Sequence, residues 1–178
     1  KSIYICPDLN YGAAVHADKW IPILPNTDAA MHLAIAYTWI TEGTYDREYV
    51  KTHTFGFDKF VPYVLGEEDG IPKTPKWAEG KCGVPARIIK ALAREWAAKR
   101  TSTAHGNGGS MIRGPFSTEP ARLEVLLLAM QGVGRPGVHQ IILNNFGLPQ
   151  SRFVPNLRAA HRGFNPARIP GQMIPKTL

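Results

Sequence analysis

The stretch WIPILPNTDAAMHLAIAYTWITE, residues 20–42, decides the fold of this chain. Residues 20–24 are β-prone or apolar, and a polar turn at 26–28 separates them from a long apolar segment. This order predicts a strand, a turn and a helix that ends at Gly43. Because the helix is apolar on nearly every face, we expect it to be buried inside a larger protein.

The turn formed by Asn26, Thr27 and Asp28 supports two interpretations. These side chains commonly accept hydrogen bonds from the free amides at a helix start, and this ordinary cap is the favoured interpretation from the residues alone. Unpaired amides at a helix start can also hold an anion or a polar heterocycle. A carboxylate at that place can accept paired donors from a guanine-like edge.

The composition is that of a globular protein. The chain has 178 residues, of which 44% are hydrophobic and 20% are charged, enough for one core. A strand-like run follows Lys1 at once, and the last residues stop without a capped element, so we expect a piece of a longer chain. His32, Thr38 and Thr41 interrupt the longest apolar run. The longest apolar run is therefore shorter than the roughly 18 residues of a membrane span, and we expect no membrane span in this segment.

The two cysteines, Cys6 and Cys82, stand far apart and neither has a CxxC partner. This spacing argues against a zinc site or a disulfide scaffold within this span, and it predicts free thiols.

The net charge of +7 is concentrated in the last part of the chain. No Asp or Glu follows Glu124, whereas six basic residues do: Arg135, Arg152, Arg158, Arg162, Arg168 and Lys176. A basic segment can mark nucleic acid, phosphate or an acidic partner, or its charge can be balanced by carboxylates elsewhere in a longer chain. We expect no nucleic-acid partner, because zinc spacing, an aromatic RNA-binding signature and a basic heptad helix are all absent from the sequence.

Two strand–loop–helix units repeat along the chain. Residues 2–6 suit a buried parallel strand, and the loop after them would lie at the carboxyl end of that strand, where open α/β sheets bind ligands. Asp8 and Asn10 in this loop are equally consistent with turn chemistry. In the second unit, a strand at 101–105 leads into GNGG at 106–109, with a helix over 118–131.

The glycine-rich loop lets the backbone approach a ligand closely, or it is a tight turn. It is not a dinucleotide fingerprint, because Ile112 stands where the third glycine of GxGxxG should be and no Walker lysine follows.

Between these units the pattern predicts mostly short helices. Residues 13–18 form a short helical or irregular link, Thr44 caps a short helix that carries Tyr45, Tyr49 and Val50, and residues 55–65 hold one or two amphipathic turns. A polar connection at 66–76 and an amphipathic helix at 84–100 follow, and the sequence after Gly132 has little periodicity.

Five segments in this order resemble the catalytic subunit of the dimethyl sulfoxide reductase family of molybdopterin oxidoreductases. They are ADKWIPILPNTDAAMHLAIAYTW, DREYVKTHTFGFDKF, GVPARIIKALAREWA, AHGNGGSMIRG and LLLAMQGVGRPGVH, and the resemblance covers residues 2 to about 140. Within the family the chain looks most like the branch of pyrogallol-phloroglucinol transhydroxylase large subunits and catechol dehydroxylases. The segments AIAYTWITEGTYDREYV, YVLGEEDGIPKTPKWAE and ALAREWAAK carry that similarity.

The resemblance implies an α/β fold, a Rossmann-like parallel sheet with flanking helices, as part of a larger multidomain molybdoenzyme. Residues 1–140 would form a segment that binds molybdopterin guanine dinucleotide. Residues 141–178 would form an irregular segment, rich in proline and arginine, that continues into the missing chain.

The resemblance also implies three cofactor-binding segments. The loop Cys6, Pro7, Asp8, Leu9 and Asn10 falls where the family has an Asp-Pro-Arg-like turn at the guanosine, and Asn26, Thr27 and Asp28 fall where it has Gly-Thr-Asp, also at that nucleotide. Gly106, Asn107, Gly108 and Met111 fall in the loop that approaches the pterin near the metal. The first loop lacks the usual arginine, and Asn26 replaces the common glycine.

The implied activity is that of a molybdenum bis(molybdopterin guanine dinucleotide) oxidoreductase acting on a small molecule, a hydroxylated aromatic, by hydroxyl transfer or reductive dehydroxylation. The metal ligand would lie upstream of Lys1, an iron–sulfur cluster would lie in the missing chain or in a partner subunit, and no catalytic residue is assigned here. The alternatives within the family are formate, nitrate and sulfoxide enzymes. Outside it, a nicotinamide-dependent dehydrogenase lacks its glycine fingerprint here, and a basic nucleic-acid-binding module is the non-enzyme alternative.

Overall fold

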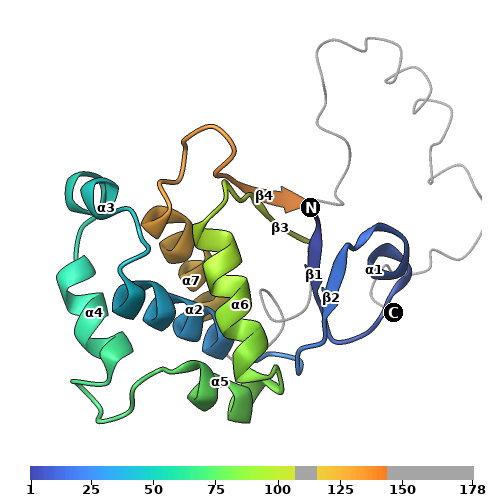
Figure 1. Cartoon of the computed structure of the whole chain (residues 1–178), viewed down its shortest axis with the longest axis horizontal. Helices are drawn as coiled ribbons and strands as arrows, with labels where there is room; N and C mark the ends of the chain where they lie inside the picture. The colour runs from blue at the N-terminus through green and yellow to red at the C-terminus, as the bar shows by residue number, and fades with distance from the viewer. Residues whose placement is uncertain (107–115, 144–178) are drawn as a thin grey trace, which may run out of the picture. The chain divides into compact units, whose positions relative to one another are not determined.

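A computed structural model describes residues 1–106 and 116–143, which belong to one compact unit (Figure 1). Their elements follow in the order β1 (Ile3–Ile5), α1 (Tyr11–His16), β2 (Lys19–Ile21), α2 (Asp28–Glu42), α3 (Arg47–His53), α4 (Phe57–Leu65), α5 (Pro75–Cys82), α6 (Ala86–Ala97), β3 (Thr103–Gly106), α7 (Thr118–Met130) and β4 (Gln140–Leu143). The predicted irregular segment lies outside the described residues from position 144 onward.

The strands form two small parallel sheets. β1 pairs with β2, with Ile5 opposite Ile21, and β3 pairs with β4, with Thr103 opposite Gln140. The mixed α/β class and the parallel pairing are confirmed, but the described residues form two separate two-stranded sheets instead of one continuous Rossmann-like sheet. β1 is half-buried and not fully buried as expected. β4 was not predicted, because four residues are too few to show a period of two.

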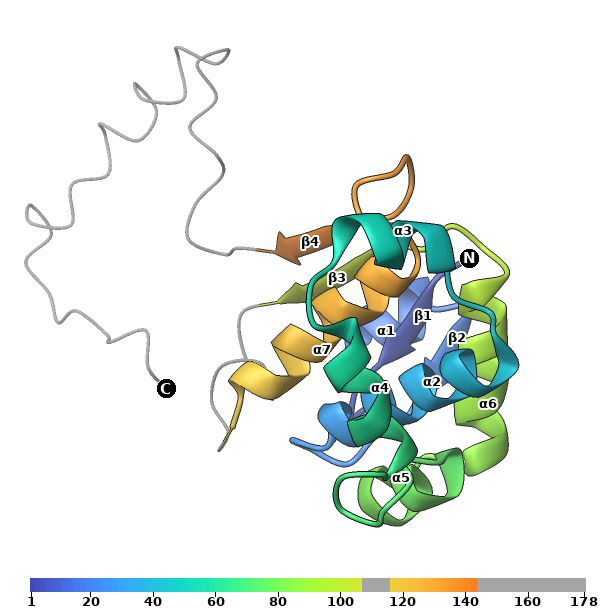
Figure 2. The same ribbon diagram turned by 90° about the vertical axis from the view of Figure 1, so that its left-hand side faces the viewer.

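Helix α2 is the centre of the unit, as its sequence predicts. It ends at Gly43, whose left-handed φ of 67° suits glycine, and its buried side chains extend around the helix. Helices α4, α5, α6 and α7 all contact it, and Figure 2 shows α2 enclosed among them. The apolar surface of α2 is thus removed from water, which is the main favourable term in folding.

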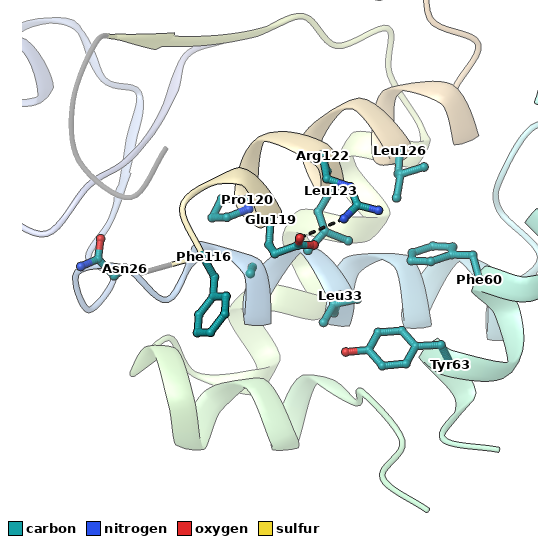
Figure 3. Close-up of a pocket in the computed structure, with 11 residues that line it drawn as sticks. Asn26, Leu33, Phe60, Tyr63, Phe116, Glu119, Pro120, Arg122, Leu123 and Leu126 are labelled. Carbon is teal, nitrogen blue, oxygen red and sulfur yellow. Dashed lines mark hydrogen bonds and ion pairs between the residues drawn. The ribbon is translucent and has the colours of Figure 1, made fainter. Parts of the chain in front are cut away.

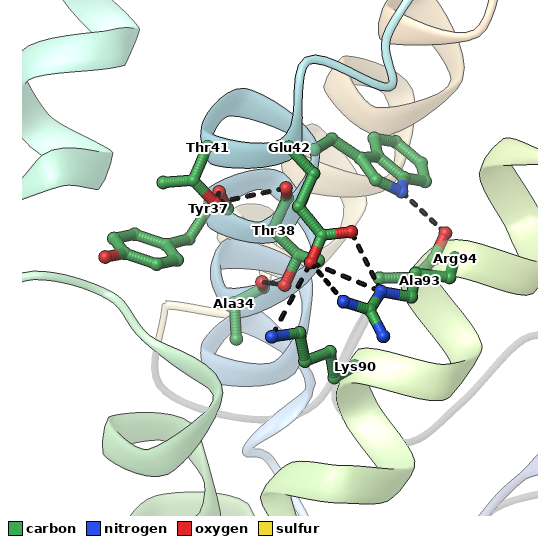
Figure 4. A network of polar contacts seen from close by, with 9 residues as sticks. Ala34, Tyr37, Thr38, Thr41, Glu42, Lys90, Ala93 and Arg94 are labelled. Carbon is green, nitrogen blue, oxygen red and sulfur yellow. Dashed lines mark hydrogen bonds and ion pairs between the residues drawn. The ribbon is translucent and has the colours of Figure 1, made fainter.

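The end of α2 is fastened to α6 by a buried hydrogen bond and surface ion pairs (Figure 4). The Trp39 indole nitrogen donates to the carbonyl oxygen of Ala93 at 2.7 Å. Glu42 accepts two hydrogen bonds of 2.9 Å from Arg94, and Lys90 lies 3.6 Å from the same carboxylate. The hydrogen bonds from Arg94 hold the pKa of the Glu42 carboxyl below its ordinary value.

Two helix starts differ from the prediction. Asp46 and not Thr44 caps α3, because its side chain accepts a 2.8 Å hydrogen bond from the Tyr49 amide. α1 begins at Tyr11, earlier than the link expected at 13–18, and Asn10 is its cap.

Helix α5 replaces the end of the predicted polar connection. Thr74 caps it and Pro75 occupies its first turn. The loop before it folds around Lys73, which is only 2% exposed, with its ammonium group 2.6 Å from the Asp69 carboxylate and over the ring of Tyr63. The burial of this lysine could not be predicted from the sequence, since lysine is almost always exposed.

Within the described residues, no helix combines the length and apolar character needed to cross a lipid bilayer.

Ala34 provides a test of the enclosure of α2. Its side chain is 0% exposed, so Ala34→Leu should overpack the core and lower the free energy of unfolding by about 1–3 kcal/mol. Ala14→Leu makes the same chemical change at an exposed position of helix α1, and there we expect a change within about 0.5 kcal/mol. Urea denaturation of both variants measures the difference. Equal stabilities would contradict the tight packing around α2.

Candidate functional site

The carboxyl ends of β1 and β2 lie at one edge, so the two chain segments that follow them leave from the same place. The Cys6 amide donates to the Ile21 carbonyl at 3.3 Å, and the Trp20 indole nitrogen donates to the Cys6 carbonyl at 3.1 Å. These bonds fasten the first loop to β2. At such an edge, open parallel sheets place their ligands.

The start of α2 is not capped in the way its sequence suggests. Thr27 occupies the cap position, but its hydroxyl donates to the Leu24 carbonyl at 2.6 Å, and no side chain of the described residues caps the helix. Asn26 has a left-handed φ of 62° and is exposed. The amides of Asp28 and Ala29 make no hydrogen bond with any described residue. Two donors therefore remain available at the positive end of the helix dipole.

The Asp28 carboxylate adds an acceptor beside these donors. It forms no hydrogen bond or ion pair within residues 1–106 and 116–143, although its charge acts on His32 and Cys82 nearby. An anionic side chain in the first turn is favoured by the helix dipole. The start of α2 thus offers amide donors and a carboxylate acceptor side by side.

The loop after β1 divides into internal and outward groups. The Asn10 side-chain oxygen accepts a 3.0 Å hydrogen bond from the Ala13 amide, and its nitrogen donates to the Cys6 sulfur at 3.7 Å. The Cys6 thiol donates to the Asp8 carbonyl, and burial raises the pKa of this thiol. Pro7, Asp8 and Leu9 are exposed. Asn10 and Cys6 are therefore engaged within the loop, while the side chain of Asp8 faces outward.

The third predicted segment is described only at its first residue. Gly106 ends β3, whereas Asn107, Gly108 and Met111 lie outside the described residues. Figure 2 shows the arrows of β1, β3 and β4 heading toward the side on which α2 and α7 begin. Gly106 thus ends its strand on the same side as the other two segments.

A cavity of about 430 Å³ lies between α2, α4 and α7, and Asn26 is part of its lining (Figure 3). Its wall is mostly apolar, with Leu33 and Tyr63 on one side and an ion pair of 2.9 Å between Glu119 and Arg122 on another. The remaining lining residues are Ala29, Phe60, Phe116, Pro120, Leu123 and Leu126. This cavity could not be predicted from the sequence, because most of its lining residues come from three helices far apart in the chain.

Within the described residues, no three His, Cys, Asp or Glu side chains are placed to hold a metal ion. Cys6 and Cys82 are both free thiols, which confirms that prediction. Cys82 is completely buried, and burial raises the pKa of its thiol. The described residues can therefore contact a cofactor through hydrogen bonds, but they offer no cluster for its metal.

Comparison with known proteins identifies several relatives, although no family model matches the chain. The pyrogallol hydroxytransferase large subunit of Pelobacter acidigallici is 46% identical over 138 residues, which are 76% of this chain and 16% of that protein. A trimethylamine-N-oxide reductase of Haemophilus influenzae is 42% identical over 67% of this chain and 14% of its own length. The dimethyl sulfoxide/trimethylamine N-oxide reductase of Rhodobacter capsulatus is 44% identical over 64% of this chain and 14% of its own.

Among solved structures, acetylene hydratase from Pelobacter acetylenicus matches 72% of this chain and 16% of its own, with a TM-score of 0.54 and 24% identity. This match shows a shared fold. The chain thus spans about one sixth of the length of the relatives it matches.

The two polar residues of the first loop should respond differently to substitution. Asn10→Ala removes the cap of α1 and should lower the free energy of unfolding by about 1 kcal/mol. Asp8→Ala, at an exposed side chain, should change it by less than about 0.5 kcal/mol. Chemical denaturation of both variants gives the comparison. A larger loss in Asp8→Ala than in Asn10→Ala would contradict this division of the loop.

Proposed function

This chain belongs to the dimethyl sulfoxide reductase family of molybdopterin oxidoreductases, and we propose that it forms one wall of the binding site for bis(molybdopterin guanine dinucleotide). The observation that carries the proposal is the open start of α2, where two amides that have no partner among the described residues adjoin the Asp28 carboxylate. A guanine edge presents paired N–H donors beside a carbonyl acceptor. The start of α2 offers the complement to both.

The residues of the first loop fit the nucleotide in part. Asp8 is exposed and can accept a hydrogen bond from a sugar hydroxyl or a base. Asn10 is occupied as the cap of α1, so it acts by holding the loop in shape and not by contact with the ligand. Cys6, Pro7 and Leu9 contribute backbone and surface, and Thr27 and Asn26 shape the turn before α2.

In the third segment, we assign Gly106, Asn107, Gly108 and Met111 to the pterin side of the site. The parallel β3 directs the chain toward the side where α2 begins, which supports this assignment. When bound, the cofactor supplies the molybdenum redox chemistry, and the protein supplies binding, orientation and electrostatics. The described residues contribute binding and orientation. Amides and carboxylates hold the nucleotide, and the packed helices keep those groups in place.

The substrate of the whole enzyme is, in this proposal, a hydroxylated aromatic ring. Support comes from the similarity to a protein named pyrogallol hydroxytransferase. Hydroxyl transfer between two phenols needs no net electrons, whereas reductive dehydroxylation consumes electrons and protons and releases water. An iron–sulfur subunit or cluster would then supply the electrons. The amine oxide and sulfoxide reductases among the relatives support the alternative of an oxygen-atom acceptor, and formate or nitrate would be further family substrates.

Asp28→Asn tests the nucleotide contact. It should weaken cofactor retention by roughly 10- to 150-fold, since hydrogen bonds to a charged group contribute about 1.5–3 kcal/mol. Asp58→Asn is the matched control, because Asp58 is also an acidic residue in the first turn of a helix but is exposed on α4. Molybdenum and guanine nucleotide in the purified full-length protein are measured after dialysis. Equal retention in both variants would reject the assignment of Asp28.

The substrate is tested by incubating the full-length, molybdenum-loaded enzyme with pyrogallol, catechols, trimethylamine N-oxide, dimethyl sulfoxide, nitrate and formate. A reduced or oxidised dye serves as electron donor or acceptor, and products are followed by chromatography. We expect turnover of a phenol. Reduction of the oxides with no change in any phenol would reject the aromatic substrate, while the cofactor assignment would stand.

A further inference from the structure

The cavity between α2, α4 and α7 continues into a smaller hollow of about 40 Å³ at the turn between α3 and α4. Phe60 and Leu126 line both, so the two form one surface, which we call the α4–α7 groove. It follows α7 from Phe116, two residues before the helix, to Met130, the last residue of the helix. At 1.5 Å for each residue, α7 makes this groove about 20 Å long.

The groove exposes large apolar side chains to water. Phe55 is fully exposed, Phe116 is 85% exposed, and Tyr63 and Leu126 are also exposed. Figure 3 shows Phe60, Tyr63 and Phe116 around the same open space. Contiguous apolar surface of this kind commonly marks a contact with another polypeptide segment.

Phe116 holds its exposed ring with a strained backbone. Its φ of 57° lies in the left-handed region, where a bulky residue is a rare outlier. Glycine or asparagine would adopt this conformation with less strain. Strained backbone of this kind is concentrated at functional positions, so the ring of Phe116 calls for a partner.

The charges on the groove compensate each other. Among the described residues that line it, Glu119 and Arg122 are the charged ones, and they form an ion pair of 2.9 Å. The groove therefore has no excess of positive charge with which to attract the phosphates of nucleic acid or of lipid headgroups. An apolar polypeptide segment fits this surface better than a charged ligand does.

We propose that an apolar segment of the same polypeptide, from outside residues 1–178, docks in the α4–α7 groove of the full-length protein. The match to the pyrogallol hydroxytransferase large subunit covers 16% of that protein, so 84% of it lies outside the match. A longer polypeptide of this kind brings its own segments to the groove at a high effective concentration, which favours them over a second molecule. The proposal goes beyond the cofactor site and does not depend on the nucleotide contact of Asp28.

The first experiment is photo-crosslinking in the full-length protein. Benzoylphenylalanine replaces Phe116 or, in a separate variant, Phe55, and mass spectrometry identifies the peptides that react on irradiation. We expect both probes to react with one segment of the same polypeptide outside residues 1–178. A probe at Lys59, an exposed residue of α4 that does not line the groove, is the control and should not react with that segment.

The other outcomes of the crosslinking overturn the proposal. They are crosslinks confined to peptides within residues 1–178, crosslinks to a second copy or to a different protein, and yields at Phe116 and Phe55 no greater than the yield at Lys59.

The second experiment removes the ring of Phe116 and keeps the backbone conformation, because asparagine tolerates the left-handed region. In full-length Phe116→Asn, we expect amide hydrogen exchange in α4 and α7 to become about tenfold faster, the change that loss of one buried aromatic side chain produces in a docking equilibrium. Thr118→Asn is the control, because Thr118 is exposed, does not line the groove and has a helix propensity similar to that of asparagine. Its exchange should change less than about twofold. Equal exchange in the two variants overturns the proposal.

Discussion

The burial of α2 on all sides is the constraint on which the rest of this structure depends. A helix with apolar side chains around its whole circumference is stable in water only when other elements cover every face. Here α4, α5, α6 and α7 supply that cover, and the sequence of each carries an apolar stripe or small side chains for it. The short sheets then lie beside a core that consists mainly of helices.

This enclosure also holds the turn before α2 rigid. The side chains that follow the turn, such as Met31 and Ile35, are packed and cannot shift without opening the core. At the far end, the bond from Trp39 to Ala93 and the ion pairs of Glu42 fix the helix against sliding. The amides and the carboxylate at the start of α2 are therefore held in place, as the proposed cofactor contact requires.

Much of this could be predicted from the sequence. The apolar run after Asn26, Thr27 and Asp28 predicted both bounds of α2 and its burial, because periodicity and caps are local signals that packing reinforces. The amphipathic helix α6 and the parallel strands followed from the same kind of pattern. The order of the quoted segments was enough to indicate the family, which the relatives then showed.

Other features were decided only by the tertiary structure. Thr27 does not cap α2 with its side chain, because its hydroxyl donates a hydrogen bond to the Leu24 carbonyl instead. Lys73 is buried because a loop folds back over it. Where α2 meets α7, the Nδ1 of His32 has no hydrogen-bond partner among the described residues. Local sequence determined which elements form and which faces are apolar, since those depend on neighbouring residues. Only the packed structure determined which polar groups remain unpaired, because their partners come from distant parts of the chain.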